Sequence, residues 1–264
     1  GNNMLTTRFG GVGFGTQTGA IAAGGAFSPG STKTDTVESY NGTSWTTSPA
    51  TLSVAKRAMG GVGTSTAGLI FGGYSGPTFL VTTESWNGSA WTEVADMSTA
   101  RRDMFALGIQ TAALGAGGYT PSPAAPTADA ESFDGTSWTG AASNMNTARD
   151  SGGSSGLYND GVAFGGAEPA ASDKTEYWNG TNWSEEADLG TARAFGAGSP
   201  AGTSSLALYA GSPGSSATEE FTVPSAPVSV AQEGQVWFNN TATVLKGFGS
   251  IGTGAWASGG TMNT

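Results

Sequence analysis

Short apolar stretches alternate with glycine-rich and polar stretches along the whole chain. The clearest of them, such as residues 68–71, are four or five residues long and end on two glycines. No apolar run approaches the roughly 20 residues that cross a membrane as a helix. Stretches of this length, bounded by glycine, are typical of β-strands and turns. The hydrophobic pattern therefore predicts an all-β fold of many short strands.

One polar and aromatic segment recurs four times with little change. It carries a glutamate, an aromatic residue, an Asn-Gly or Asp-Gly pair and a closing tryptophan, and the tryptophans are 46, 47 and 45 residues apart. A fifth copy at residues 219–221 lacks its tryptophan. Self-similarity at this period is typical of a repeat architecture. The four copies contain Glu38 and Trp45, Glu84 and Trp91, Glu131 and Trp138, and Glu176 and Trp183.

Two further features recur upstream of each copy. One is a segment of 11 residues that ends on a glycine pair in four repeats, and the other is a basic residue before a glycine-rich apolar stretch. We assign the basic position to Arg8, Arg57, Arg101, Arg149 and Arg193. Each repeat then contains four strands, and the Asn-Gly pair predicts a two-residue type I′ turn between the third and fourth.

A single four-stranded sheet of this size must stack against neighbours, as the blades of a β-propeller do. The order of basic residue, glycine pair, aromatic residue and tryptophan resembles the kelch repeat over residues 5–221. The resemblance implies an all-β, kelch-like β-propeller of five blades, or of six if the C-terminal hairpin forms a blade.

The end of the chain departs from the repeat. We predict a propeller over 1–221, an extended linker over 222–234 because of its two prolines, and a hairpin and strand over 235–264. Trp256 lies in a segment similar to the tryptophan strands. We expect its strand to close this propeller or an adjacent one.

Composition narrows the chemistry. The chain of 264 residues has no Cys and no His, and 20 acidic residues against 10 basic ones give a net charge of −10. Disulfides, thiolate metal sites and histidine-based catalysis are therefore excluded, and nucleic-acid binding is disfavoured. We expect no cofactor and no metal. The repeated glutamates suit ion pairs with the repeated basic residues better than the asymmetric carboxylate pair of a glycosidase, so a carboxylate-based glycan-active enzyme is a minor alternative.

Function is expected where the repeats differ. The most variable loop follows each glycine pair, and loops on a rigid scaffold commonly carry binding residues; Tyr74, Phe79 and Tyr119 are the candidate contacts. Residues 234–240 and 245–247 resemble segments of structural proteins of marine tailed bacteriophages. That resemblance implies a virion-surface, extracellular protein of a tail fibre or capsid decoration. It would attach to a host-surface glycan or protein, or to a neighbouring virion subunit. The alternative is an architectural module that forms homo-oligomers or tandem arrays by strand donation, without membrane insertion.

Overall fold

The computed structural model describes residues 1–27, 32–199, 202–222, 236–239 and 244–247. Gly1–Thr222 forms one compact unit. The second unit, Val223–Thr264, contains a described antiparallel hairpin of β23 (Val236–Asn239) and β24 (Val244–Gly247). Trp256 and nearly all of the expected linker lie outside the described residues.

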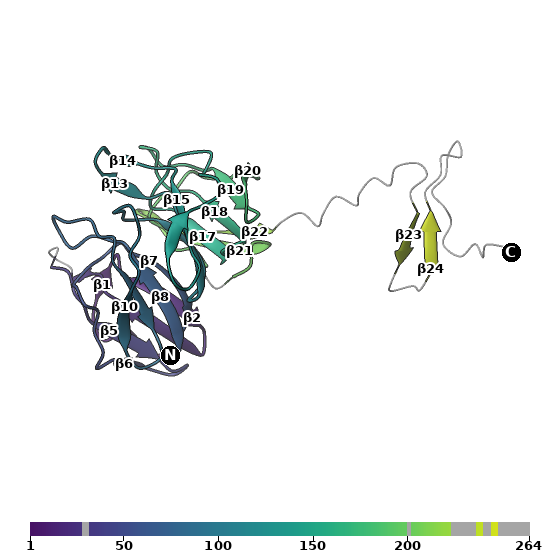
Figure 1. Cartoon of the computed structure of the whole chain (residues 1–264). Coiled ribbons are helices and arrows are strands. Elements are labelled where there is room, and N and C mark those ends of the chain that lie inside the picture. Colours follow the sequence, from purple (N-terminus) through teal and green to yellow (C-terminus); the bar gives the residue numbers. More distant parts are fainter. Residues whose placement is uncertain (28–31, 200–201, 223–235, 240–243, 248–264) are drawn as a thin grey trace. The chain divides into compact units, whose positions relative to one another are not determined.

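The first unit is a β-propeller of antiparallel sheets, with no helix among its described residues (Figure 1). Four sheets have four strands each, in chain order from first to fourth. The first strands of successive sheets lie side by side. We call these sheets blades 1 to 4. Blade 1 contains β2 (Val12–Thr16), β3 (Gly19–Ala23), β5 (Val37–Tyr40) and β6 (Trp45–Thr47), and blade 2 contains β7 (Gly60–Thr64), β8 (Ala67–Phe71), β9 (Thr83–Trp86) and β10 (Trp91–Val94). Blade 3 contains β11 (Phe105–Ile109), β12 (Ala112–Ala116), β15 (Ala130–Phe133) and β16 (Trp138–Gly140), and blade 4 contains β17 (Gly153–Leu157), β18 (Asp160–Phe164), β19 (Thr175–Trp178) and β20 (Trp183–Glu185).

The expected all-β propeller is confirmed, but the expected count of five or six blades is wrong for the described residues. The fifth repeat forms only the hairpin of β21 (Leu206–Ser212) and β22 (Ser215–Thr222). Its first strand is reduced to two bridges, which join Ala197 to Ala210 and Thr203 to Leu206. We call this hairpin with its bridges the half-blade. Two small strand pairs complete the unit: β1 (Arg8–Phe9) with β4 (Ala26–Phe27), and β13 (Tyr119–Pro121) with β14 (Ala124–Pro126).

The turn between the third and fourth strands differs from the expected type I′ turn. Tyr40 pairs with Trp45, so four residues make the connection, and only Gly42 has a positive φ, of +89°. The Asn41 side-chain oxygen accepts the backbone N–H groups two and three residues ahead, at 3.0 and 2.9 Å. Side-chain capping by Asn or Asp therefore sets this turn. The same pattern occurs at Asn87, Asp134 and Asn179.

The glycine pairs join each blade to the next. Gly72 and Gly73 have φ values of +64° and +106°, and the Gly73 N–H donates to the carbonyl of Arg101, in the following repeat, at 2.8 Å. A Cβ atom on Gly72 would lie 2.7 Å from that same carbonyl oxygen. Only glycine combines this backbone conformation with this close approach.

A chain of backbone hydrogen bonds links the starts of the first-strand segments. One residue of each repeat has a left-handed φ between +56° and +63°. Each N–H donates to the carbonyl of the equivalent residue one repeat earlier, at 2.7 to 2.9 Å. We call this chain the collar; it runs from Gly10 through Ala58, Asp103 and Ser151 to Phe195. No hydrogen bond joins Phe195 to Gly10, both of which are described, so the collar is open there.

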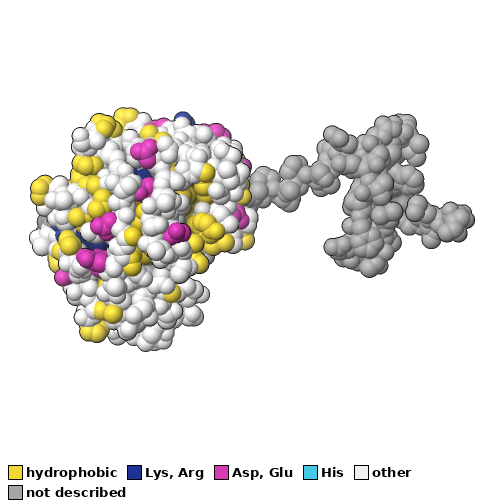
Figure 2. All heavy atoms as spheres, in the orientation of Figure 1, with side chains coloured by type: hydrophobic (Ala, Val, Ile, Leu, Met, Phe, Trp, Pro, Cys, Tyr) yellow, Lys and Arg dark blue, Asp and Glu magenta, His cyan; other side chains and the backbone are white. Residues whose placement is uncertain are grey.

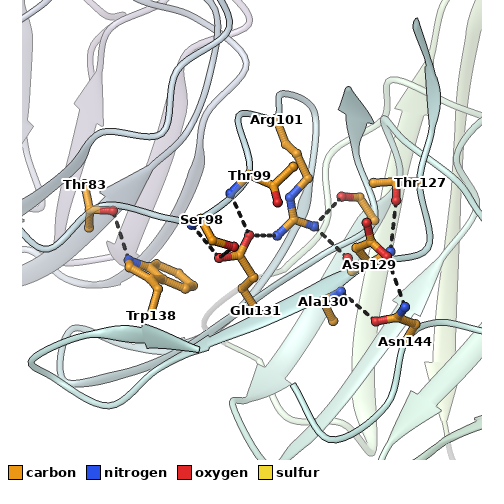
Figure 3. A network of polar contacts seen from close by, with 11 residues as sticks. Thr83, Ser98, Thr99, Arg101, Thr127, Asp129, Ala130, Glu131, Trp138 and Asn144 are labelled. Carbon is orange, nitrogen blue, oxygen red and sulfur yellow. Dashed lines mark hydrogen bonds and ion pairs between the residues drawn. The ribbon is translucent and has the colours of Figure 1, made fainter. Parts of the chain in front are cut away.

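A buried ion pair fixes the entrance of each blade, as Figure 3 shows for blade 3. Arg101 Nη2 lies 2.9 Å from a carboxylate oxygen of Glu131, and both side chains are buried. Arg101 Nη1 also donates to the carbonyls of Gly117 and Asp129, at 3.0 and 2.6 Å. Glu131 in turn accepts the backbone N–H of Ser98 at 2.7 Å. The pair thus ties the incoming chain to the second and third strands.

The same pair recurs in every repeat, with one change from the sequence-based assignment. In blade 2 the buried cation is Lys56 and not Arg57. Burial lowers the pKa of Arg101 below its ordinary value, and the Glu131 carboxylate opposes that shift. The other pairs are Arg8 with Glu38 at 2.5 Å, Lys56 with Glu84 at 2.8 Å, Arg149 with Glu176 at 2.8 Å, and Arg193 with Glu219.

Neutralising Glu131 should reveal the free-energy cost of burying the charge of Arg101. We expect Glu131→Gln to lower the free energy of unfolding by about 3–5 kcal/mol, because Arg101 would keep a buried charge without its counter-ion. The control is Glu168→Gln, which removes a half-exposed pair with Lys174 at 3.8 Å and should cost about 1 kcal/mol or less. Urea unfolding of both variants measures this difference. Equal losses would contradict a special role for the buried pair.

Candidate binding face

The three candidate contacts from the variable loops gather in one cluster. The rings of Tyr74 and Phe79 meet edge to face, with 5.4 Å between their centroids. Phe79 stacks with Tyr119 of the next repeat, with 6.3 Å between centroids. All three side chains are half-buried. Neighbouring loops that the sequence singled out separately therefore form one aromatic surface.

Cationic side chains cover this aromatic surface. The Arg102 guanidinium carbon lies 4.9, 5.5 and 6.0 Å from the ring centroids of Tyr119, Phe79 and Tyr74. The Arg57 guanidinium carbon lies 5.6 Å from the Tyr74 centroid, and the Lys33 ammonium 5.1 Å from it. Guanidinium groups at such distances are attracted to the ring faces. We call these six residues the aromatic–cationic cluster: Lys33, Arg57, Tyr74, Phe79, Arg102 and Tyr119.

Sequence reasoning missed the cations of this cluster. Arg57 was placed in the structural series, and Arg102 and Lys33 were not selected. A signal was present, because only the second and third repeats carry two consecutive basic residues, Lys56 with Arg57 and Arg101 with Arg102. The first of each doublet enters the buried ion pair, and the second reaches the aromatic rings.

Two carboxylates lie next to the cluster. Asp103, in the collar, forms an ion pair with Arg102, and Asp150 lies one residue before the collar residue Ser151. Desolvation raises the pKa of Asp103 above its ordinary value of 3.8, although Arg102 opposes the shift; nearby Asp150 adds to it. Desolvation also raises the pKa of Asp150, against a hydrogen bond from Ser151 and the charge of Arg102. Arg57 makes no ion pair with any described residue.

The acidic surface sets the cluster apart from its surroundings. No Lys or Arg among the described residues of Gly1–Thr222 is exposed, and Figure 2 accordingly shows scattered acidic side chains but little basic surface on the visible face of this unit. The half-buried Arg57 and Arg102 are thus local cationic positions on a protein of net charge −10.

A second feature lies between blade 1 and the half-blade. A cavity of about 590 Å³ is lined by Phe14, Ile21 and Trp45 on one side and by Ser199 and Gly202 on the other. An adjoining hollow of about 330 Å³ runs over β21 and β22. Leu206 and Leu208 of β21 are 66 % and 39 % exposed. Blade 1 and the half-blade therefore do not pack against each other as the other neighbouring blades do.

The described residues contain no group of three or more acidic residues placed to hold a metal ion. No described helix is long and apolar enough to cross a membrane.

Comparison with known proteins supports the fold. No family model and no curated protein matches the sequence. A solved structure, described as "Structure of YjhT", is similar with a TM-score of 0.67 and 14 % sequence identity, over 83 % of this chain and 82 % of that chain. At this identity the likeness concerns the β-propeller fold alone.

The raised pKa of Asp103 gives a pH dependence with a definite sign. The folded protein holds this proton to a higher pH than the unfolded chain does, so the contribution of Asp103 to stability falls as pH rises above about 3.8. Asp103→Asn should therefore become more stable relative to the natural protein between about pH 3.5 and 7, and asparagine tolerates the φ of +56° at this position.

Asp134→Asn is the matched control with the opposite sign. The backbone N–H groups of Ser137 and Thr136 lower the pKa of Asp134, so this carboxylate stabilises the fold above its unfolded pKa. Urea unfolding across the pH range compares the two variants. Parallel pH profiles would show that Asp103 is not desolvated as described.

Proposed function

We propose that this chain is a non-enzymatic binding propeller of a phage virion, with kelch-like repeats, that attaches to a host-surface glycan through the aromatic–cationic cluster. One observation carries the binding role: the guanidinium of Arg102 faces three aromatic rings contributed by two neighbouring repeats. The virion setting rests on the sequence resemblance of residues 234–240 and 245–247.

The chemistry of the cluster suits a sugar. Half-buried aromatic faces can pack against the C–H faces of a sugar ring, and guanidinium groups can donate to its hydroxyl or carboxylate oxygens. Arg57 is available for such a contact because it has no ion-pair partner among the described residues. The side chains of Phe79 and Tyr119 have few rotamers and stack on each other, so ordering these two rings adds little to the entropic cost of binding.

A second candidate function is architectural, with copies joined by strand donation. The feature that favours it is the outer edge of β22, which pairs with no described strand, beside the exposed Leu206 and Leu208. An open edge with apolar neighbours can accept a strand from another chain.

Binding to an array of bacterial surface polysaccharides tests the glycan proposal. We expect Phe79→Ala to weaken binding about tenfold, since loss of one aromatic contact costs on the order of 1.4 kcal/mol. The control is Tyr158→Ala, which removes an aromatic side chain, 42 % exposed, at the β17–β18 turn, the opposite end of the strands.

Two outcomes would contradict the proposal. One is that the natural protein binds no polysaccharide on the array. The other is that Tyr158→Ala weakens binding as much as Phe79→Ala does, because the glycan would then contact a different face.

A further inference from the structure

A buried hydroxyl in blade 4 has no hydrogen-bond partner among the described residues. Thr175, in β19, is 1 % exposed, and its Oγ1 meets no described donor or acceptor. A buried hydroxyl without a partner costs free energy, so its partner group is normally found close by.

The equivalent hydroxyl in blade 2 has a partner from the following blade. Thr83 and Thr175 each come directly before the glutamate of the buried ion pair. The Thr83 hydroxyl accepts the indole N–H of Trp138, on the fourth strand of blade 3, at 3.0 Å (Figure 3). By the same relation, the donor to Thr175 would lie on the fourth strand of the half-blade.

The junctions of blade 1 with blade 2 and of blade 3 with blade 4 have the same packing without the hydrogen bond. Val37 and Ala130 occupy the threonine position in blades 1 and 3, where no hydroxyl is available. Trp91 packs in the cluster that contains Val37, and Trp183 in the one that contains Ala130. The indole N–H groups of both tryptophans are buried without a partner. The bond therefore forms only where threonine precedes the glutamate.

An apolar socket surrounds the vacant donor position. In blades 2 and 3, Trp138 packs with Phe71, Met97 and Phe133, which are at most 3 % exposed. The corresponding residues at the half-blade are Phe164, Leu189 and Phe221. Leu189 and Phe221 are only partly buried, as expected where no described tryptophan packs against them.

Two tryptophans of the chain belong to none of the described blades, Trp237 and Trp256. Trp237 belongs to β23, which already pairs with β24. Trp256 is followed six residues later by Met262, as Trp91 is by Met97 and Trp183 by Leu189. We propose that residues 252–258 of this same chain add the fourth strand to the half-blade, with the Trp256 indole N–H donated to the Thr175 hydroxyl.

The chain's own segment fits this position better than a second copy. Residues 223–235 and 248–251, on either side of the β23–β24 hairpin, supply a connection that can extend about 3.3 Å per residue, and a tethered segment has an effective concentration in the millimolar range. The start of the chain already occupies the position that follows a fourth strand, because the Leu5 N–H donates to Glu38 at 2.8 Å, as the Ser98 N–H does to Glu131. Among the described residues, no outer strand lies between β22 and this position. This inference does not depend on the ligand of the aromatic–cationic cluster.

A disulfide in the full-length chain tests the register. The natural chain has no cysteine. Pairing Phe221 with Trp256, as Tyr40 pairs with Trp45, places Glu220 opposite Ala257, the position where the Ser39 and Thr46 side-chain oxygens lie 3.1 Å apart. We expect Glu220→Cys with Ala257→Cys to form a disulfide within one chain. The control, Glu220→Cys with Ser258→Cys, directs the second thiol to the other face of the sheet and should cross-link much more slowly.

Each result of the cross-linking experiment either supports or overturns the proposal. A disulfide within a monomer, seen by non-reducing electrophoresis and mass spectrometry, supports the proposal. A disulfide between two chains would overturn it in favour of strand donation. Two free thiols, or equal cross-linking of the control pair, would overturn it altogether.

A double-mutant cycle tests the hydrogen bond. Thr175→Val should lower the melting temperature of the natural protein by about 2–4 °C and have no such effect in Trp256→Phe. The control background Trp237→Phe should retain the full effect of Thr175→Val. Equal effects in all three backgrounds would show that Trp256 does not supply the donor.

Discussion

In every repeat a basic side chain is buried at the entrance to the blade, and a charge removed from water must be met by an opposite charge and by hydrogen bonds. A glutamate of the third strand supplies the charge, and in blade 3 the carbonyls of Gly117, directly after the second strand, and of Asp129, directly before the third, accept hydrogen bonds from the arginine. The glutamate also accepts an N–H of the incoming chain. One ion pair therefore positions the incoming chain, the end of the second strand and the third strand. Its main effect is this placement and not a large net gain in stability.

The same basic residue connects neighbouring blades through its backbone. Its carbonyl accepts the N–H of the second glycine of the preceding repeat, which is why that glycine pair needs both a left-handed backbone and the absence of Cβ. The collar residue follows two positions later and bonds to its counterpart in the preceding repeat. Blade geometry and ring geometry thus depend on one short stretch of chain, and the half-blade keeps its place in the collar although its described residues include no outer strand.

The features that recur at fixed spacing could be predicted from the sequence. The propeller fold follows from the tryptophans, glycine pairs and glutamates, which repeat about every 46 residues. What could not be predicted depends on contacts between repeats. The buried cation of blade 2 was assigned wrongly because Lys56 and Arg57 are adjacent and carry the same charge. They differ only in which way their side chains point, toward Glu84 or toward Tyr74. The turn type was wrong because Asn41 bonds through its side chain. Arg102 was missed because the rings of Tyr74 and Phe79, which it covers, belong to the preceding repeat.

Two consecutive positions at the entrance of each blade are constrained differently. The buried seat accepts either lysine or arginine, because a lone ammonium can also meet the glutamate. The following position is free to vary, and in the second and third repeats it holds an arginine directed at aromatic rings, whereas the fourth repeat has Asp150 and the fifth has Ala194 there. The two arginines of the aromatic–cationic cluster therefore come from two adjacent blades, and Lys33 reaches Tyr74 from the first repeat. A repeat protein can in this way vary the side chains of one sector while every blade keeps its own entrance pair.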